Sequence, residues 1–122
     1  MERLHAACKN PHVHMIAHPT GRIIGQREGY NPDIEQLIKW ASECGKILEV
    51  NASPYRLDLR TEHVIQAMEA GVNIAINTDA HAIEQLDIMP SGVEYAQKAW
   101  VPAELVVNTW TLETFIEKVI RR

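Results

Sequence analysis

An aspartate and a histidine stand two positions apart directly after a short apolar segment of this chain. The segment, Val72–Ile76, is rich in β-branched residues and follows Gly71, which is typical of a buried parallel strand. Asp79 and His81 come just after it, at the strand end where α/β proteins gather their ligands. A carboxylate oxygen and an imidazole nitrogen at such a position are suitable ligands for divalent metal ions.

A second predicted strand, His12–Ala17, ends in a similar way. His18 follows it directly, and Pro19 favours an extended backbone at His18 and ends the strand there. Two arginines follow predicted strands, Arg22 after this one and Arg56 after the next. A guanidinium can hold two phosphate oxygens at once, so both arginines are candidate substrate-binding residues.

Each of these residues also has an ordinary structural interpretation. His18 can be a strand-end histidine bonded to the backbone, and Asp79 can cap a helix. Arg56 can pair with Asp58 in a loop salt bridge instead of binding substrate. Asn51 and Asn77, each at a strand end, can orient a ligand-binding side chain or merely hold their own loops.

The same choice applies to Glu49, which lies within a predicted strand. It either faces the interior and serves a function, or faces solvent at a sheet edge.

Strands and helices are predicted to alternate four times. The predicted strands are His12–Ala17, Ile47–Val50, Asn73–Asn77 and Leu105–Asn108. The first predicted helix begins at Pro32 behind an Asn31 cap and ends at Gly45, and the second runs from near Thr61 to Gly71. The third opens at a Ser91–Glu94 capping box, and the fourth runs over about Leu112–Arg121. This alternation predicts an α/β fold of right-handed βαβ units with a parallel sheet, as half a barrel or a small open sheet.

The composition narrows the class of protein. A length of 122 residues suits one domain, and the chain has no apolar run long enough for a membrane span or a signal peptide. The two cysteines lack metal-ligand spacing, which predicts free thiols in a cytoplasmic protein. The net charge of −4 lacks the basic excess of a self-sufficient nucleic-acid binder, although four arginines follow predicted strand ends: Arg22, Arg27, Arg56 and Arg60.

Four motifs in order carry a resemblance to a known family. They are His18–Arg22, Asn51–Leu59, Asn77–His81 and Asn108–Trp110. Together they resemble the C-terminal half of the PHP (polymerase and histidinol phosphatase) domain, in the version found at the end of bacterial and archaeal family X DNA polymerases. The resemblance covers the chain from about Asn10 onward and implies a partial barrel of PHP type.

The resemblance implies metal-dependent phosphoester hydrolysis, in the form of a 3′–5′ exonuclease or a related DNA end-processing activity. It implies that His18, Asp79 and His81 each bind one of three metal ions, for which zinc, manganese and iron suit such mixed ligands. The other ligands of the family belong to the half that is absent here. Residues 1–122 are therefore expected to form a single partial domain, whose partners are the rest of the PHP domain, the polymerase domain and, through the intact parent, DNA.

Two other functions stay open at this point. One is a free-standing PHP phosphatase that acts on a small phosphomonoester such as histidinol phosphate. The other is an inactive structural or interaction module. A half-barrel leaves sheet edges unpaired, which predicts self-association of the isolated chain.

Overall fold

The computed structural model describes residues 1–26 and 28–121, and its centre is a parallel sheet of three strands. The strands are β1 (Met15–Ile16), β2 (Ile47–Asn51) and β3 (Ile74–Asn77), in the order β1-β2-β3. Met15 lies opposite Ile47, and Leu48 lies opposite Ile74. The predicted α/β fold with a parallel sheet is confirmed, although β1 is shorter than the predicted His12–Ala17 because only two of its residues pair with β2.

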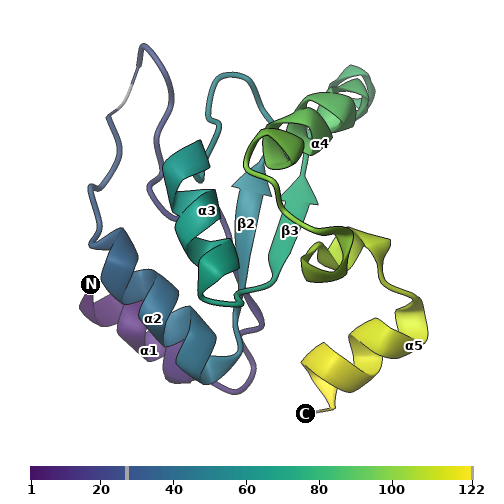
Figure 1. Ribbon diagram of the computed structural model, residues 1–122. Coiled ribbons are helices and arrows are strands. Elements are labelled where there is room, and N and C mark those ends of the chain that lie inside the picture. The colour runs from purple at the N-terminus through teal and green to yellow at the C-terminus, as the bar shows by residue number, and fades with distance from the viewer. Residues whose placement is uncertain (27, 122) are drawn as a thin grey trace.

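Helices connect the strands. The helices up to residue 98 pack on one face of the sheet, and the C-terminal helical segment packs on the other (Figure 1). The α-helices are α1 (Glu2–Lys9), α2 (Ile34–Cys44), α3 (Thr61–Glu69), α4 (Met89–Lys98) and α5 (Leu112–Phe115), and α5 continues into a π-helical turn, η4 (Ile116–Ile120). Three 3-10 segments complete the order: η1 (Ile83–Ile88), η2 (Ala103–Leu105) and η3 (Val107–Thr109). Helix α1 packs on α2, α2 on α3, and α3 on α4.

The helix ends correct two of the predicted caps. Asp33, not Asn31, caps α2, and its side chain accepts a hydrogen bond from Gln36 N at 3.0 Å. Gly45 ends α2 in the left-handed conformation as predicted, with φ 61°. The predicted capping box is wrong because α4 already begins at Met89, directly after η1.

Gly92, a residue of that predicted box, serves packing instead. A Cβ at this position would lie 2.5 Å from Ala52 Cβ and 2.7 Å from Ile76 Cγ2. A glycine therefore lets α4 approach β2 and β3 closely.

The predicted fourth strand, Leu105–Asn108, is also wrong. Its residues form 3-10 turns, and a single parallel bridge joins Val106 to Ile74. The Asn108 side chain takes over the role of a strand backbone at this edge, since Oδ1 accepts from Ile76 N at 2.8 Å and Nδ2 donates to Ile76 O at 2.8 Å. One amide side chain thus satisfies both backbone groups that a fourth strand would otherwise have paired.

Alternation along the strands gives the sheet two different faces. Leu48, Val50, Ile74 and Ile76 point to the main core under the helices. On the other face, the apolar cluster is smaller and consists of Ile47, Ala75, Val107 and Val119, covered by the C-terminal segment. Towards the carboxyl ends of the strands, this second face becomes polar.

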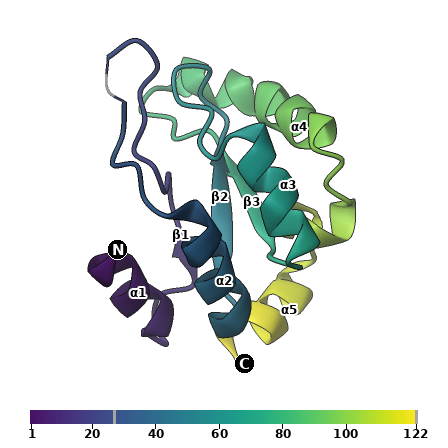
Figure 2. The ribbon, with the colours of Figure 1, turned by 60° about the vertical axis from the view of Figure 1, so that its left-hand side comes forward.

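The loops that follow the three strands rise together at the arrowhead end of the sheet (Figures 1 and 2). Both cysteines are free thiols, as predicted, and burial raises the pKa of the Cys8 thiol. Within residues 1–26 and 28–121, no helix combines the length and apolar character needed to cross a bilayer.

Candidate functional site

A polar cluster occupies the carboxyl ends of β2 and β3. Glu49 and Asn51 alternate with the apolar Leu48 and Val50 along β2, so they share the face opposite the main core. Asn77, at the end of β3, lies in register with Asn51. The strand period therefore delivers three polar side chains to one end of one face.

Glu49 is the centre of the first half of this cluster. It is 5% exposed, and its carboxylate accepts from His18 N at 2.6 Å and from Asn77 Nδ2 at 2.9 Å. Glu49 thus faces the interior and is not solvated at a sheet edge. The carboxylate ties the end of β1 to the end of β3 and holds His18 at φ 28°, a backbone conformation that non-glycine residues seldom adopt.

Asp79 is the centre of the second half. Its Oδ2 accepts from Asn51 Nδ2 at 3.2 Å and lies 3.5 Å from Arg56 Nε. Asn51 is fully buried, so it is a fixed donor to the carboxylate. The structure therefore brings together Asn51, Arg56 and Asp79, which come from two successive strand ends.

Asp58 binds the backbone of the loop after β1 and does not pair with Arg56. It is 1% exposed, and its Oδ2 accepts from Thr20 N at 3.0 Å, Thr20 Oγ1 at 2.8 Å and Gly21 N at 3.0 Å. Of the two interpretations of Arg56, the loop salt bridge with Asp58 is not the one observed, because Arg56 pairs with Asp79 while Asp58 holds the loop after β1.

The two predicted phosphate-binding arginines are in different states. Arg22 donates from Nε to the Arg56 carbonyl at 3.0 Å and from Nη2 to the Leu57 carbonyl at 2.7 Å, so it supports the loop after β2. Arg56 Nη1 is buried and has no hydrogen-bond partner among the residues that the structure describes. Arg60 is exposed at the N-cap of α3, and Arg27 lies outside the described residues.

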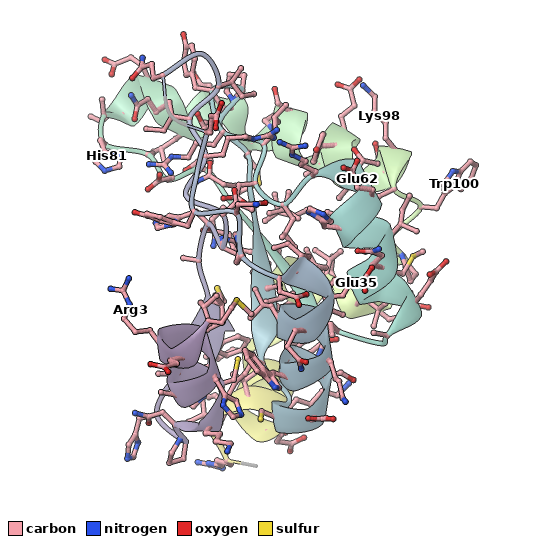
Figure 3. All side chains as sticks on the ribbon, turned by 90° about the vertical axis from the view of Figure 1, so that its left-hand side faces the viewer. Arg3, Glu35, Glu62, His81, Lys98 and Trp100 are labelled. Carbon is pink, nitrogen blue, oxygen red and sulfur yellow. The ribbon has the colours of Figure 1, made fainter. Side chains whose placement is uncertain are left out.

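His81 lies at the outer edge of the molecule (Figure 3). Its Nδ1 is 2.6 Å from the Asp79 carbonyl, and its backbone N donates to Gln85 Oε1 at 2.6 Å. A carbonyl oxygen can only accept, so this contact assigns the proton to Nδ1 and leaves the lone pair on Nε2. An imidazole oriented in this way presents Nε2 as a candidate metal ligand.

The donor types suit a divalent metal, but their number does not. Among residues 1–26 and 28–121, no group of three or more histidine, cysteine, aspartate or glutamate side chains is placed to hold a metal ion. Asp79 and His81 are neighbours through the contact of His81 Nδ1 with the Asp79 carbonyl, whereas His18 is fixed separately through Glu49. The residues that the structure describes therefore do not complete a metal site by themselves.

Comparison with known proteins finds similarity to a DNA polymerase along the whole of this chain. The DNA polymerase/3′-5′ exonuclease PolX of Bacillus subtilis is 52% identical over all 122 residues, which correspond to 21% of that protein. Probable phosphatases from Caldanaerobacter subterraneus and Caldicellulosiruptor saccharolyticus are 33% and 34% identical and align with 84% and 92% of this chain. The chain covers 41% and 46% of those two proteins, so it spans less than half the length of each relative. No protein-family model matches the chain.

The parallel βα fold and its polar strand ends define an α/β protein with its candidate site at the carboxyl edge of the sheet. The resemblance to the C-terminal part of the PHP domain of family X DNA polymerases is confirmed, because all 122 residues of this chain match the Bacillus protein.

Sequence reasoning missed the roles of two residues that shape this site. Asp58 fixes the loop beside His18, and Asn108 completes the backbone bonding of β3 next to Asn77. For Asp58 a signal existed, since its two leucine neighbours, Leu57 and Leu59, indicate a buried loop. For Asn108 no local signal existed, because its partner lies 32 positions away along the chain.

Proposed function

We propose that this chain is the C-terminal part of a PHP-type phosphoesterase domain whose intact parent hydrolyses DNA at 3′ ends. The observation that carries the proposal is the cluster of Asn51, Arg56, Asp79 and His81 at two strand ends. The 52% identity to a protein named as a polymerase and 3′-5′ exonuclease supports DNA as the substrate of the parent.

In this proposal the chain supplies part of a divalent metal centre. His18, Asp79 and His81 each contribute a ligand, and the remaining ligands come from the part of the parent outside these residues. A zinc, manganese or iron ion held by these ligands would supply Lewis-acid activation of water and would offset charge on the phosphoryl oxygens. Glu49 and Asn77 fix His18, and Asn51 orients the Asp79 carboxylate.

Arg56 has the role of a phosphate-binding residue. Its guanidinium lies beside Asp79, and the buried Nη1 has no acceptor within the described part of the chain. A phosphate oxygen is a suitable acceptor for this N–H. Arg22 contributes indirectly, because it holds the carbonyls of Arg56 and Leu57.

The test uses the intact parent with Asp79→Asn, a change that keeps the side-chain shape and removes its charge. We expect about 100-fold or greater loss of 3′-end hydrolysis of a labelled oligonucleotide, together with a lower metal content. Asp87→Asn is the matched control, because Asp87 is exposed in η1 and belongs to no part of the cluster. The proposal is contradicted if the Asp79→Asn protein hydrolyses 3′ ends at the rate of the unsubstituted parent and has the same metal content.

A second candidate function is hydrolysis of a small phosphomonoester, which the similarity to probable phosphatases favours. It predicts that the parent cleaves histidinol phosphate and leaves oligonucleotide ends intact.

A third candidate is an inactive interaction module, which the incomplete metal site favours. It predicts that the isolated chain neither hydrolyses phosphoesters nor binds divalent metal. The edge strand β1 also predicts dimers or larger species in sedimentation of the isolated chain, and a stable monomer contradicts that expectation.

A further inference from the structure

Exposed apolar side chains follow all three strand ends. Ile24 belongs to the loop after β1, Tyr55 to the loop after β2, and Ile83 to η1 after β3, with exposures of 47%, 70% and 83%. Single exposed apolar residues are common on protein surfaces. Tyr55 differs from the others because its neighbour in sequence, Arg56, reaches into the candidate site.

The backbone of Tyr55 is held in place although its ring is exposed. The Tyr55 carbonyl accepts from Ile24 N at 2.6 Å, which links the loops after β1 and β2. The next two amides, of Arg56 and Leu57, both donate to the Ser53 carbonyl at 2.9 and 3.0 Å. Tyr55 is therefore an aromatic side chain on a fixed turn, so a ligand that packs on it has little backbone to order.

Arg56 is in a different environment from Tyr55. Its side chain is 20% exposed, its Nε lies 3.5 Å from Asp79 Oδ2, and its Nη1 is buried without a partner among the described residues. A guanidinium N–H in this state needs an acceptor, and an anionic oxygen is the strongest one. Two consecutive residues thus offer an aromatic face and an anion donor, which matches the base and the phosphate of one nucleotide.

We propose that Tyr55 stacks on the base of the nucleotide whose phosphate contacts Arg56, and so selects nucleic-acid ends over small phosphomonoesters. This inference rests on the proposed function and names its substrate class as a single-stranded nucleotide that carries a base. Stacking on an aromatic ring accepts every base, so the selection is independent of sequence. Tyr55 is a specificity-determining residue in this proposal and takes no part in the bond cleavage.

The experiment compares Tyr55→Ala and Tyr55→Phe in the intact parent on two oligonucleotides. One oligonucleotide ends in a normal 3′ nucleotide, and the other ends in an abasic residue with the same phosphate. For the normal end we expect Tyr55→Ala to raise KM by about 10-fold or more and to change kcat by less than about twofold. For the abasic end we expect the same KM in the unsubstituted parent and in Tyr55→Ala. We expect Tyr55→Phe to have the KM of the unsubstituted parent on both oligonucleotides.

Trp100→Ala is the matched control. Trp100 is an aromatic residue with 85% exposure, and it projects from the opposite side of the molecule from His81 (Figure 3). Its removal should leave KM unchanged on both oligonucleotides. An equal rise in KM for the normal and the abasic ends in Tyr55→Ala overturns the inference, and so does an equal effect of Trp100→Ala.

A binding measurement separates this inference from the proposed function. Fluorescence anisotropy with the same two oligonucleotides reports base-dependent binding without any hydrolysis. If the parent binds the normal end more tightly than the abasic end and Tyr55→Ala removes the difference, the inference stands even when no cleavage occurs. If binding does not depend on the base, the inference fails even when cleavage occurs.

Discussion

Different interactions stabilise the two ends of one face of the sheet. At the amino end of β2, Ile47 packs with Ala75, Val107 and Val119 in a small apolar cluster. Two residues further along the same face, Glu49 is also buried but is held by hydrogen bonds from His18 N and Asn77 Nδ2. The apolar end depends on the area removed from water, whereas the polar end depends on the direction of each bond.

This difference separates stability from geometry. Apolar contacts are non-directional, so small shifts of the C-terminal segment over Ile47 cost little. A buried carboxylate that serves two donors allows much less freedom, because a lost bond leaves an unpaired group away from water. Changes at the apolar end should therefore act on unfolding, and changes at the polar end should act on the site as well.

The largest effect on unfolding is expected for Ile47→Ala. Ile47 is 1% exposed, and its truncation removes buried area and leaves a cavity. We expect the free energy of unfolding to fall by about 2–5 kcal/mol in urea titrations, against about 0.5–1.5 kcal/mol for the matched Ile47→Val. At urea concentrations below the unfolding midpoint, the intact parent with Ile47→Ala should hydrolyse its substrate at an unchanged rate. A loss of kcat at full folding contradicts the separation of the two ends.

For Glu49→Gln we expect the opposite pattern, with a smaller loss of stability and a large loss of hydrolysis. The new amide can accept from only one of the two donors and presents its own N–H groups to the other. We expect a destabilisation of about 1–3 kcal/mol from the unpaired group and a loss of about 10–100-fold in hydrolysis by the parent. Asn77→Ala is the control, because it preserves the bond from His18 N and should lose less activity. Parental kcat in folded Glu49→Gln counts against a role for Glu49 in holding His18.

A smaller effect is expected for Asn108→Ala, which removes both side-chain bonds to the Ile76 backbone. Asn108 is exposed, so water can replace part of what is lost, and we expect about 1 kcal/mol of destabilisation. The local signature should be faster hydrogen exchange of the Ile76 amide. Unchanged protection of that amide shows that β3 does not depend on the Asn108 side chain.

The sequence predicts the parts of this molecule that depend on local pattern. Apolar runs predict β2 and β3. Asn51, at the end of β2, and Asp79, two residues after β3, lie at the carboxyl edge of the sheet where the sequence places them. The last predicted strand fails although its run of β-branched residues is similar. The difference is tertiary, since the Asn108 side chain supplies the bonds that a strand would have made.

The partners of the charged groups could not be predicted in the same way. Arg56 and Asp58 are near neighbours in sequence, but Leu57 between them adopts a left-handed conformation with φ 45°. Arg56 then pairs with Asp79, and Asp58 caps the loop at Thr20 and Gly21. A leucine carries no sequence signal for positive φ, because that conformation favours glycine and asparagine, so the path of this loop is set by the packed structure.

The smallest effect concerns His63 of α3, which belongs to neither end of the face. Burial is the main cause that lowers the pKa of His63 from its ordinary 6.5; Glu62 opposes this shift and Arg60 adds to it. Its Nδ1 is buried and has no partner within the described residues. The native state therefore keeps this imidazole neutral at a pH where the unfolded chain already binds a proton.

Linkage gives the sign of the pH dependence. Above pH 6.5 neither state binds the proton and His63 contributes no slope, whereas below pH 6.5 the unfolded state binds more protons and stability falls until native His63 also protonates. As the pH is lowered from 7 to 5, we expect the urea midpoint of the unsubstituted protein to fall more steeply than that of His63→Gln. Glu62→Gln should steepen the parental slope slightly, because it removes the charge that raises the pKa. Parallel profiles for all three proteins would mean that His63 binds its proton equally well in both states.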